Sequence, residues 1–175
     1  TDSTGSYKIY MDYAGNFTAN DITVDLNNGY FEADDGVRLD IRNSNINLGS
    51  TSSNYWYIYS SRANFLNTPL VNNIEEDYGS ELVLTRSPVT GDVKAMHDSD
   101  VTLSGSAVSG DIYSDGGRIV KDSSSVGGSL IVQNGPVVEV SGGTLTVKAD
   151  PAAPDTAGSS DFIQQAYKDD FESCE

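Results

Sequence analysis

Three copies of one five-residue phrase constrain the fold of this chain more than any other feature. The phrase reads VTGDV at 89–93, VSGDI at 108–112 and VGGSL at 126–130, so its copies recur at nearly equal steps. Three of its positions keep these two steps, and they hold Val89/Val108/Val126, Gly91/Gly110/Gly128 and Val93/Ile112/Leu130. A further set, Val83/Val101/Ile119/Val137, steps evenly by a similar amount. The period is about 18 residues, whereas helical repeats and propeller blades need about 33–50 residues, so it is too short for either.

A period of this length suits one coil of a β-solenoid, in which short strands bend at small residues and stack on the coil below. Stacked strands lie about 4.8 Å apart, so each inward column must hold similar side chains from coil to coil. We therefore predict an all-β solenoid whose repeat coils cover 83–147. The columns Val83/Val101/Ile119/Val137 and Val89/Val108/Val126 should face inward, and the repeated glycines should mark corners.

The repeated V-x-G-[D/S]-[I/V/L] phrase, alternating with short Val/Ile strands over Val83–Val147, resembles the bactofilins and related polymer-forming β-helix domains. The resemblance implies a β-helix that polymerises end to end without a nucleotide.

Residues 1–148 are expected to form a single all-β domain. Residues 7–60 alternate apolar and polar side chains, which predicts strands, but they do not keep the period of the repeat coils. They form either wider, irregular coils of the same solenoid, which we favour, or a small capping sheet. The segment 60–80 shows no period and is predicted to be a loop. A β-sandwich is the alternative fold.

The C-terminal segment changes character. Residues 149–160 read ADPAAPDTAGSS, which contains Pro and Gly without periodicity and predicts a linker. Residues 161–175 are acidic and are predicted to form a short amphipathic helix or tail, because Ile163, Tyr167 and Phe171 recur at helical spacing beside Phe162.

The charge of the chain limits its partners. The net charge is −16, from 26 acidic and 10 basic residues, which argues against binding to nucleic acid or to an anionic membrane surface. No apolar run is long enough to span a bilayer. The abundance of Asn, Asp, Ser, Thr, Gly and Tyr is common in secreted proteins and predicts an extracellular or cell-surface location. The chain begins at Thr1 rather than Met, which suggests a processed or trimmed product, and Asn16 begins a glycosylation sequon.

Little in the sequence predicts catalysis. His97 is the only histidine and is predicted to be a solvated turn residue, so a histidine triad and a multi-histidine metal site are excluded within one chain. No phosphate-binding loop or dinucleotide fingerprint occurs, and we predict no enzyme, no catalytic residue, no cofactor and no resident metal. Calcium could bridge turn carboxylates, although surface turns explain them more simply; the candidates are Asp34, Asp35, Asp98, Asp100 and Asp115.

The densest aromatic stretch is NYWYIY at 54–59. Alternation places Tyr55, Tyr57 and Tyr59 on one face of a strand, with Trp56 and Ile58 on the other. The strip could stack on sugar rings or on a partner protein, or it could simply be a core strand with surface hydroxyls, which we favour.

We therefore predict a structural subunit that self-assembles into an extracellular or cell-surface filament, such as a pilus-like fibre. The residues expected at its assembly interface come from the first strand and from the tail, and they are Tyr7, Ile9, Met11, Tyr13, Phe162, Ile163, Tyr167 and Phe171. The alternatives are a monomeric carbohydrate-binding adhesin that uses the tyrosine strip, and a pilin-like β-sandwich that donates its first strand.

Overall fold

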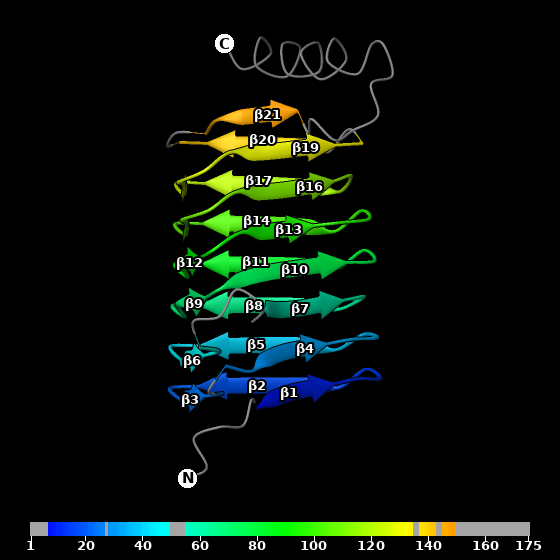
Figure 1. Cartoon of the computed structure of the whole chain (residues 1–175), viewed down its shortest axis with the longest axis vertical. Helices are drawn as coiled ribbons and strands as arrows, with labels where there is room; N and C mark the ends of the chain where they lie inside the picture. The colour runs from blue at the N-terminus through cyan, green and yellow to red at the C-terminus, as the bar shows by residue number, and fades with distance from the viewer. Residues whose placement is uncertain (1–6, 27, 50–54, 135–136, 143–144, 150–175) are drawn as a thin grey trace.

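The chain winds into a β-solenoid with three faces. The computed structural model describes residues 7–26, 28–49, 55–134, 137–142 and 145–149. Within these ranges the chain forms strands and turns only, and no helix there is long and apolar enough to cross a membrane. The strands belong to three parallel sheets, and the chain climbs from the coil nearest the N-terminus to β21 (Figure 1).

Each coil contributes one strand to each sheet in turn. Sheet A contains β1 (Lys8–Met11), β4 (Tyr30–Ala33), β7 (Tyr55–Tyr59), β10 (Asn73–Asp77), β13 (Val93–Ala95), β16 (Ile112–Asp115), β19 (Leu130–Gln133) and β21 (Val147–Ala149). Sheet B contains β2 (Asn16–Asn20), β5 (Arg38–Arg42), β8 (Arg62–Leu66), β11 (Glu81–Thr85), β14 (Asp100–Ser104), β17 (Arg118–Asp122) and β20 (Val137–Ser141). Sheet C contains β3 (Thr23–Asp25), β6 (Asn45–Asn47), β9 (Leu70–Val71), β12 (Val89–Thr90), β15 (Ala107–Val108) and β18 (Ser125–Val126). We number the coils from the N-terminus, so that coil 1 is β1–β3, coil 2 is β4–β6 and coil 4 is β10–β12.

The core is a narrow stack of columns between the three sheets. Alternate residues of each strand point inward, and the register brings similar residues above one another, as in the fully buried column Phe31, Trp56, Ile74 and Val93. Phe31 and Trp56 stack with ring centroids 5.1 Å apart. The indole N–H of Trp56 donates to the backbone oxygen of Val71 at 3.3 Å, so its polar atom is satisfied inside the core.

The repeated phrase is explained by the corner between sheet C and sheet A. The N–H of Gly110 donates to the oxygen of Gly91, and the N–H of Gly128 donates to that of Gly110, each at 3.0 Å. A Cβ on Gly110 would lie 2.7 Å from the Gly91 oxygen and 2.1 Å from Oδ1 of Asp92, so only glycine allows this approach. The prediction that these glycines form corners is confirmed.

The other two corners are built on left-handed backbone and buried hydroxyls. Between sheets B and C, one position has a positive φ in successive coils, at Asp21, Asn43, Asn67, Arg86, Gly105, Ser123 and Gly142. The next residue is a buried Ser or Thr in coils 2 to 6, and its hydroxyl oxygen accepts a backbone N–H from the coil below. The ladder of donors and acceptors includes Thr68 to Ser87, Ser87 to Ser106 and Ser106 to Ser124, at 3.0, 2.9 and 2.9 Å. These bonds hold the coils in register.

The predicted solenoid is confirmed, and the β-sandwich alternative is wrong. Residues 7–49 form two wider coils rather than a separate cap: equivalent residues step by 22 from Lys8 to Tyr30 and by 25 from Phe31 to Trp56. The predicted loop at 60–80 is also wrong, because that segment contains β8, β9 and β10. The period continues through this segment, since Arg62 pairs with Glu81 and Leu70 pairs with Val89, 19 residues further on in each case.

One predicted inward column is partly wrong. Val101 and Ile119 pair and are buried as expected. Val83 pairs with Thr102, however, and Val137 pairs with Arg118 and is 54% exposed. Leu82 and Val138 occupy the column instead. The step between paired residues is one residue longer from Leu82 to Val101, and again from Ile119 to Val138, than it is from Val101 to Ile119. A slip of one residue moves a side chain to the other face of a strand. The columns Val89/Val108/Val126 and Val93/Ile112/Leu130 pair as predicted.

The predicted linker and the predicted helix lie almost wholly outside the described residues, which end at Ala149 in β21. The helix and its residues Phe162, Ile163, Tyr167 and Phe171 therefore stay predictions.

Candidate functional site

The outer face of sheet A carries a row of tyrosines. Tyr55, Tyr57 and Tyr59 point outward from β7 and are half-buried, whereas Trp56 and Ile58 are fully buried, so the predicted alternation is confirmed. The ring centroids of Tyr55 and Tyr57 are 5.4 Å apart with planes inclined by 21°, and those of Tyr57 and Tyr59 are 5.7 Å apart. The three rings therefore stand side by side along the strand.

Neighbouring coils extend this row into an aromatic surface, which we call the tyrosine face. Tyr30 of coil 2 contacts the Tyr57 ring edge-on at 5.8 Å, and Tyr78 contacts Tyr59 at 6.4 Å. Lys8 lies over the Tyr30 ring and Lys94 lies over the Tyr55 ring, each with 5.6 Å between Nζ and the centroid.

These contacts limit how the tyrosine face could bind a sugar. The ring of Tyr57 lies between the rings of Tyr55 and Tyr59, and ammonium groups lie over Tyr30 and Tyr55. Stacking on a pyranose needs a free ring face, but this surface presents mainly ring edges and hydroxyls.

Carboxylates flank the central tyrosine. Glu32 of β4 and Glu75 of β10 are the residues paired with Tyr57 on its two sides. The Tyr59 hydroxyl donates to Oε1 of Glu75 at 3.2 Å. Burial, followed by the negative charge of Glu75, raises the pKa of Tyr57 and of Tyr59. Burial and the charge of Asp34 raise the pKa of Glu32. The raised pKa values of Tyr57 and Tyr59 keep these two hydroxyls as hydrogen-bond donors.

His97 sits at the edge of this surface, at the corner between sheets A and B. Its Nδ1 lies 2.5 Å from Oδ1 of Asp77, and its ring stacks on Tyr78 with centroids 5.6 Å apart. The hydrogen bond and charge of Asp77 raise the pKa of His97. The sequence predicted an exposed turn residue at His97, and its side chain is indeed 56% exposed, but its contacts could not be read from the sequence.

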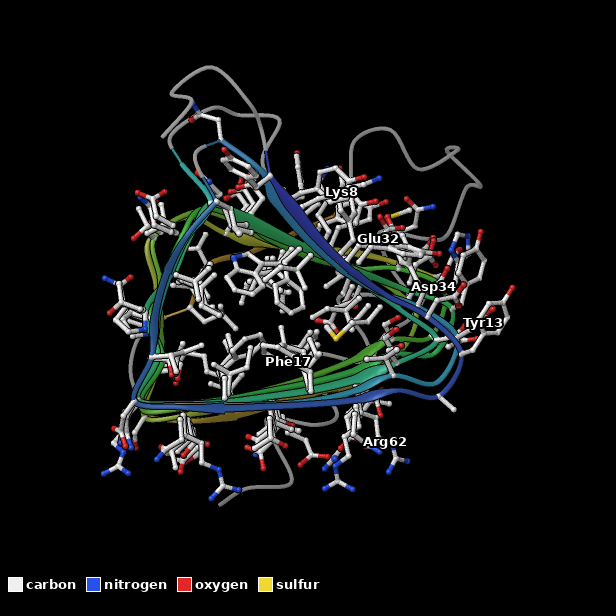
Figure 2. The ribbon with its side chains drawn as sticks, turned by 90° about the horizontal axis from the view of Figure 1, so that it is seen from below. Lys8, Tyr13, Phe17, Glu32, Asp34 and Arg62 are labelled. Atoms are coloured by element: carbon white, nitrogen blue, oxygen red, sulfur yellow. The ribbon has the colours of Figure 1, made fainter. Side chains whose placement is uncertain are left out.

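The second candidate surface is the open end of coil 1. β1, β2 and β3 are the terminal strands of their sheets, so no other described strand pairs with their outer edges. Inward side chains that are fully buried in later coils are only partly buried here, at Ile9, Met11, Phe17 and Val24. Figure 2 looks onto this end and shows Phe17 pointing between the three sheets.

The structure divides the predicted assembly residues of the first strand into two groups. Ile9 and Met11 point toward the core at the open end. Tyr7 precedes β1 and is 49% exposed, and Tyr13 lies at a corner with φ 58° and is 81% exposed. The four residues therefore do not share one face.

Comparison with family models, with curated proteins and with solved structures finds no match to this chain. Its function has to be argued from the two surfaces themselves.

The core also holds a carboxyl group that the sequence did not single out. Glu76 points inward from β10, between Ile58 and Ala95 in neighbouring coils, and it is fully buried. Neither of its carboxyl oxygens has a hydrogen-bond partner within the described part of the chain. Burial, with a smaller contribution from Asp100 and Glu81, holds the pKa of Glu76 well above its usual range and so favours the protonated carboxyl in the folded protein.

The turn carboxylates considered for calcium do not converge in the structure. Among the residues it describes, no group of three or more Asp, Glu, His or Cys side chains could hold a metal ion. Asp34 accepts the N–H of Asp35 within its own turn, and Asp115 accepts the side-chain amide of Asn134 from the next coil.

Proposed function

We propose that this protein is a non-enzymatic structural subunit that assembles end to end, through the open face of coil 1, into an extracellular or cell-surface filament. The observation that carries the proposal is that this end exposes strand edges and apolar side chains. Three terminal strands leave their outer edges unpaired in the described chain, and apolar columns end there partly buried.

Both features favour association. A strand edge presents N–H and C=O groups that can continue the ladder with another chain. Full burial of a large apolar side chain is worth about 1.5–3 kcal/mol, so completing the burial of Ile9, Met11, Phe17 and Val24 would contribute a few kcal/mol in total. The resemblance of the repeated phrase to polymer-forming β-helix domains supports the same reading.

The net charge of −16 opposes assembly, since copies of the chain repel one another. Repulsion between exposed charges is screened within about 8 Å at physiological salt, whereas strand pairing and apolar contact persist. Assembly through coil 1 should therefore be promoted by high salt or by divalent cations.

Light scattering over a range of protein and salt concentrations tests this proposal. The mean mass of the wild-type particles should increase with protein concentration and with salt concentration, and deletion of 7–13 should weaken this increase.

A sharper test is the variant Phe17→Lys, because a lysine can extend from the open end while placing a charge where a second copy would pack. The matched control is Thr102→Lys, which adds the same charge on the outer face of β14. A Phe17→Lys protein that melts like the control and still assembles like the wild type would overturn the proposal.

The tyrosine face supports a second candidate, a monomeric adhesin module that binds carbohydrate. Its hydroxyls, with Glu32 and Glu75, could hydrogen-bond sugar hydroxyls along the row. This candidate predicts a monomer under all conditions, and it predicts titratable binding of a neutral oligosaccharide that is lost in Tyr57→Ala.

A further inference from the structure

The arginines of the described chain lie on one side of the solenoid. Arg38, Arg42, Arg62 and Arg118 belong to strands of sheet B, and Arg86 directly follows β11 of the same sheet. None of them lies on sheet A. The acidic tyrosine face and the arginines therefore occupy different faces, and Figure 2 shows Glu32 and Asp34 on one side of the solenoid and Arg62 on another.

Two of these arginines are neighbours whose charges are incompletely neutralised. Arg38 and Arg62 are directly paired in β5 and β8, and both are exposed. Arg62 contacts Glu81 at 3.1 Å but keeps 74% of its side chain exposed. Arg38 makes no salt bridge within the described residues, whereas Arg42 is held by Asp40 at 2.7 Å. Like charges paired directly across strands destabilise a sheet. An external anion that binds both arginines would therefore relieve the repulsion between them.

The opposite charge lies on sheet A at the same height. Coil 2 contributes Glu32 and Asp34, coil 4 contributes Glu75 and Asp77, and the tyrosine row of coil 3 lies between them. Glu75 has a lysine near it, Lys94 at 3.8 Å, and His97 pairs with Asp77. Glu32 and Asp34 have no salt bridge within the part of the chain that the structure describes.

From this charge complementarity we infer that the tyrosine face of one copy binds the Arg38–Arg62 pair of a second copy, so that solenoids associate side by side. This inference rests on the proposed structural function and adds a lateral contact to the end-to-end one. A guanidinium group suits such a site because its several N–H groups can form charge-assisted hydrogen bonds with the carboxylates and can also donate to the tyrosine hydroxyl oxygens.

The geometry suits a weak contact that repeats along a fibre. Both patches lie in coils 2 to 4, so two copies with parallel axes meet at the same height. Three coils at about 4.8 Å and five residues at about 3.3 Å make each patch roughly 240 Å². A buried total of roughly 500 Å² is well below that of a standard stable interface, so a single contact is weak. Each copy uses a different face toward each neighbour, so association can continue beyond a pair, and end-to-end assembly multiplies the contacts.

The test uses a chain whose end contact is blocked by Phe17→Lys, or by Val24→Lys if the first variant does not fold. Sedimentation velocity at physiological ionic strength, which screens the general repulsion between the acidic chains, should then show reversible association. In the same background, two double variants should each associate with at least tenfold lower affinity. They are Arg38→Glu/Arg62→Glu and Glu32→Lys/Glu75→Lys. The control Arg118→Glu, which reverses a charge in coil 6, should retain it.

Mixing the two charge-reversed proteins decides the question. Each has lost its own pairing, but the new lysines of one match the new glutamates of the other, so the mixture should associate although neither protein does alone. Two folded variants that stay monomeric when mixed would overturn the inference. Binding of an oligo-arginine peptide to the tyrosine face without association of copies would also overturn it, and it would assign that face to a foreign basic partner. In either case, filaments formed by the unblocked chain would leave the end-to-end proposal standing.

Discussion

The carboxylate of Asp92 accepts a hydrogen bond from the backbone N–H of Asp111, 2.9 Å away in the next coil. The same contact joins Asn73 to Asp92 below, at 2.8 Å, and Asp111 to Ser129 above, at 2.7 Å. The repeated phrase thus places a side-chain acceptor directly after the glycine that lets the next coil approach. Its polar centre holds together the corner between sheets C and A.

Replacing Gly110 with alanine should destabilise the fold by about 1–3 kcal/mol, because the added Cβ would lie 2.7 Å from the backbone oxygen of Gly91 as well as 2.1 Å from Oδ1 of Asp92. Gly15→Ala is a matched control, since a Cβ there meets its nearest atom at 3.8 Å. Urea denaturation should separate the two variants clearly. Equal midpoints would show that the glycine column is not needed for close stacking.

Replacing Ile119 with aspartate should cost several kcal/mol, because the side chain is 1% exposed and a charge there would be unpaired. Val137→Asp introduces the same charge at a neighbouring strand position that is 54% exposed, and it should change the melting temperature little. The pair tests the register directly, and a reversed order of melting temperatures would contradict it.

Replacing Ser106 with alanine removes the acceptor of the Ser87 N–H, 2.9 Å away in the buried ladder. An unpaired buried N–H costs about 1–3 kcal/mol. Ser106→Thr should be milder, because Thr68 fills the same position two coils below. A higher melting temperature for Ser106→Ala than for Ser106→Thr would refute a stabilising role for the hydroxyl.

Glu76 should make the fold less stable as pH rises. Burial raises its pKa in the folded state, so the folded protein keeps a proton that the unfolded chain releases near its ordinary pKa. The contribution of this group is complete below the unfolded pKa of about 4.3 and is lost as pH rises toward the folded pKa, with a slope of up to about 1.4 kcal/mol per pH unit.

Urea denaturation of the wild type and of Glu76→Gln across acidic to neutral pH isolates this effect, because the general repulsion of the acidic surface is common to both. The difference in unfolding free energy should shift in favour of Glu76→Gln as pH rises. A difference that stays constant with pH would mean that the carboxyl ionises inside the fold without cost.

The repeat coils were predictable from the sequence because their steps are nearly constant. Val89, Val108 and Val126 recur at almost equal intervals, and they do form one column. Val83 was assigned wrongly because an apolar residue, Leu82, stands beside it, and a period that varies by a single position cannot decide between neighbours.

The candidate surfaces were harder to predict. The outward position of Tyr57 followed from alternation, but its neighbours Glu32 and Glu75 are set by pairing across coils of unequal length. The burial of Glu76 was hidden for another reason. It sits in an acidic run, Glu75-Glu76-Asp77, whose composition predicts exposure, and only the strand alternation turns its middle residue inward.

Negative-stain microscopy of the purified chain over a rising series of protein concentrations, at physiological and at high salt, tests end-to-end assembly most directly. The account predicts filaments one or a few solenoids wide that lengthen with concentration and salt, and that are absent in Phe17→Lys but present in Thr102→Lys. Isolated short particles at every concentration and salt would contradict it.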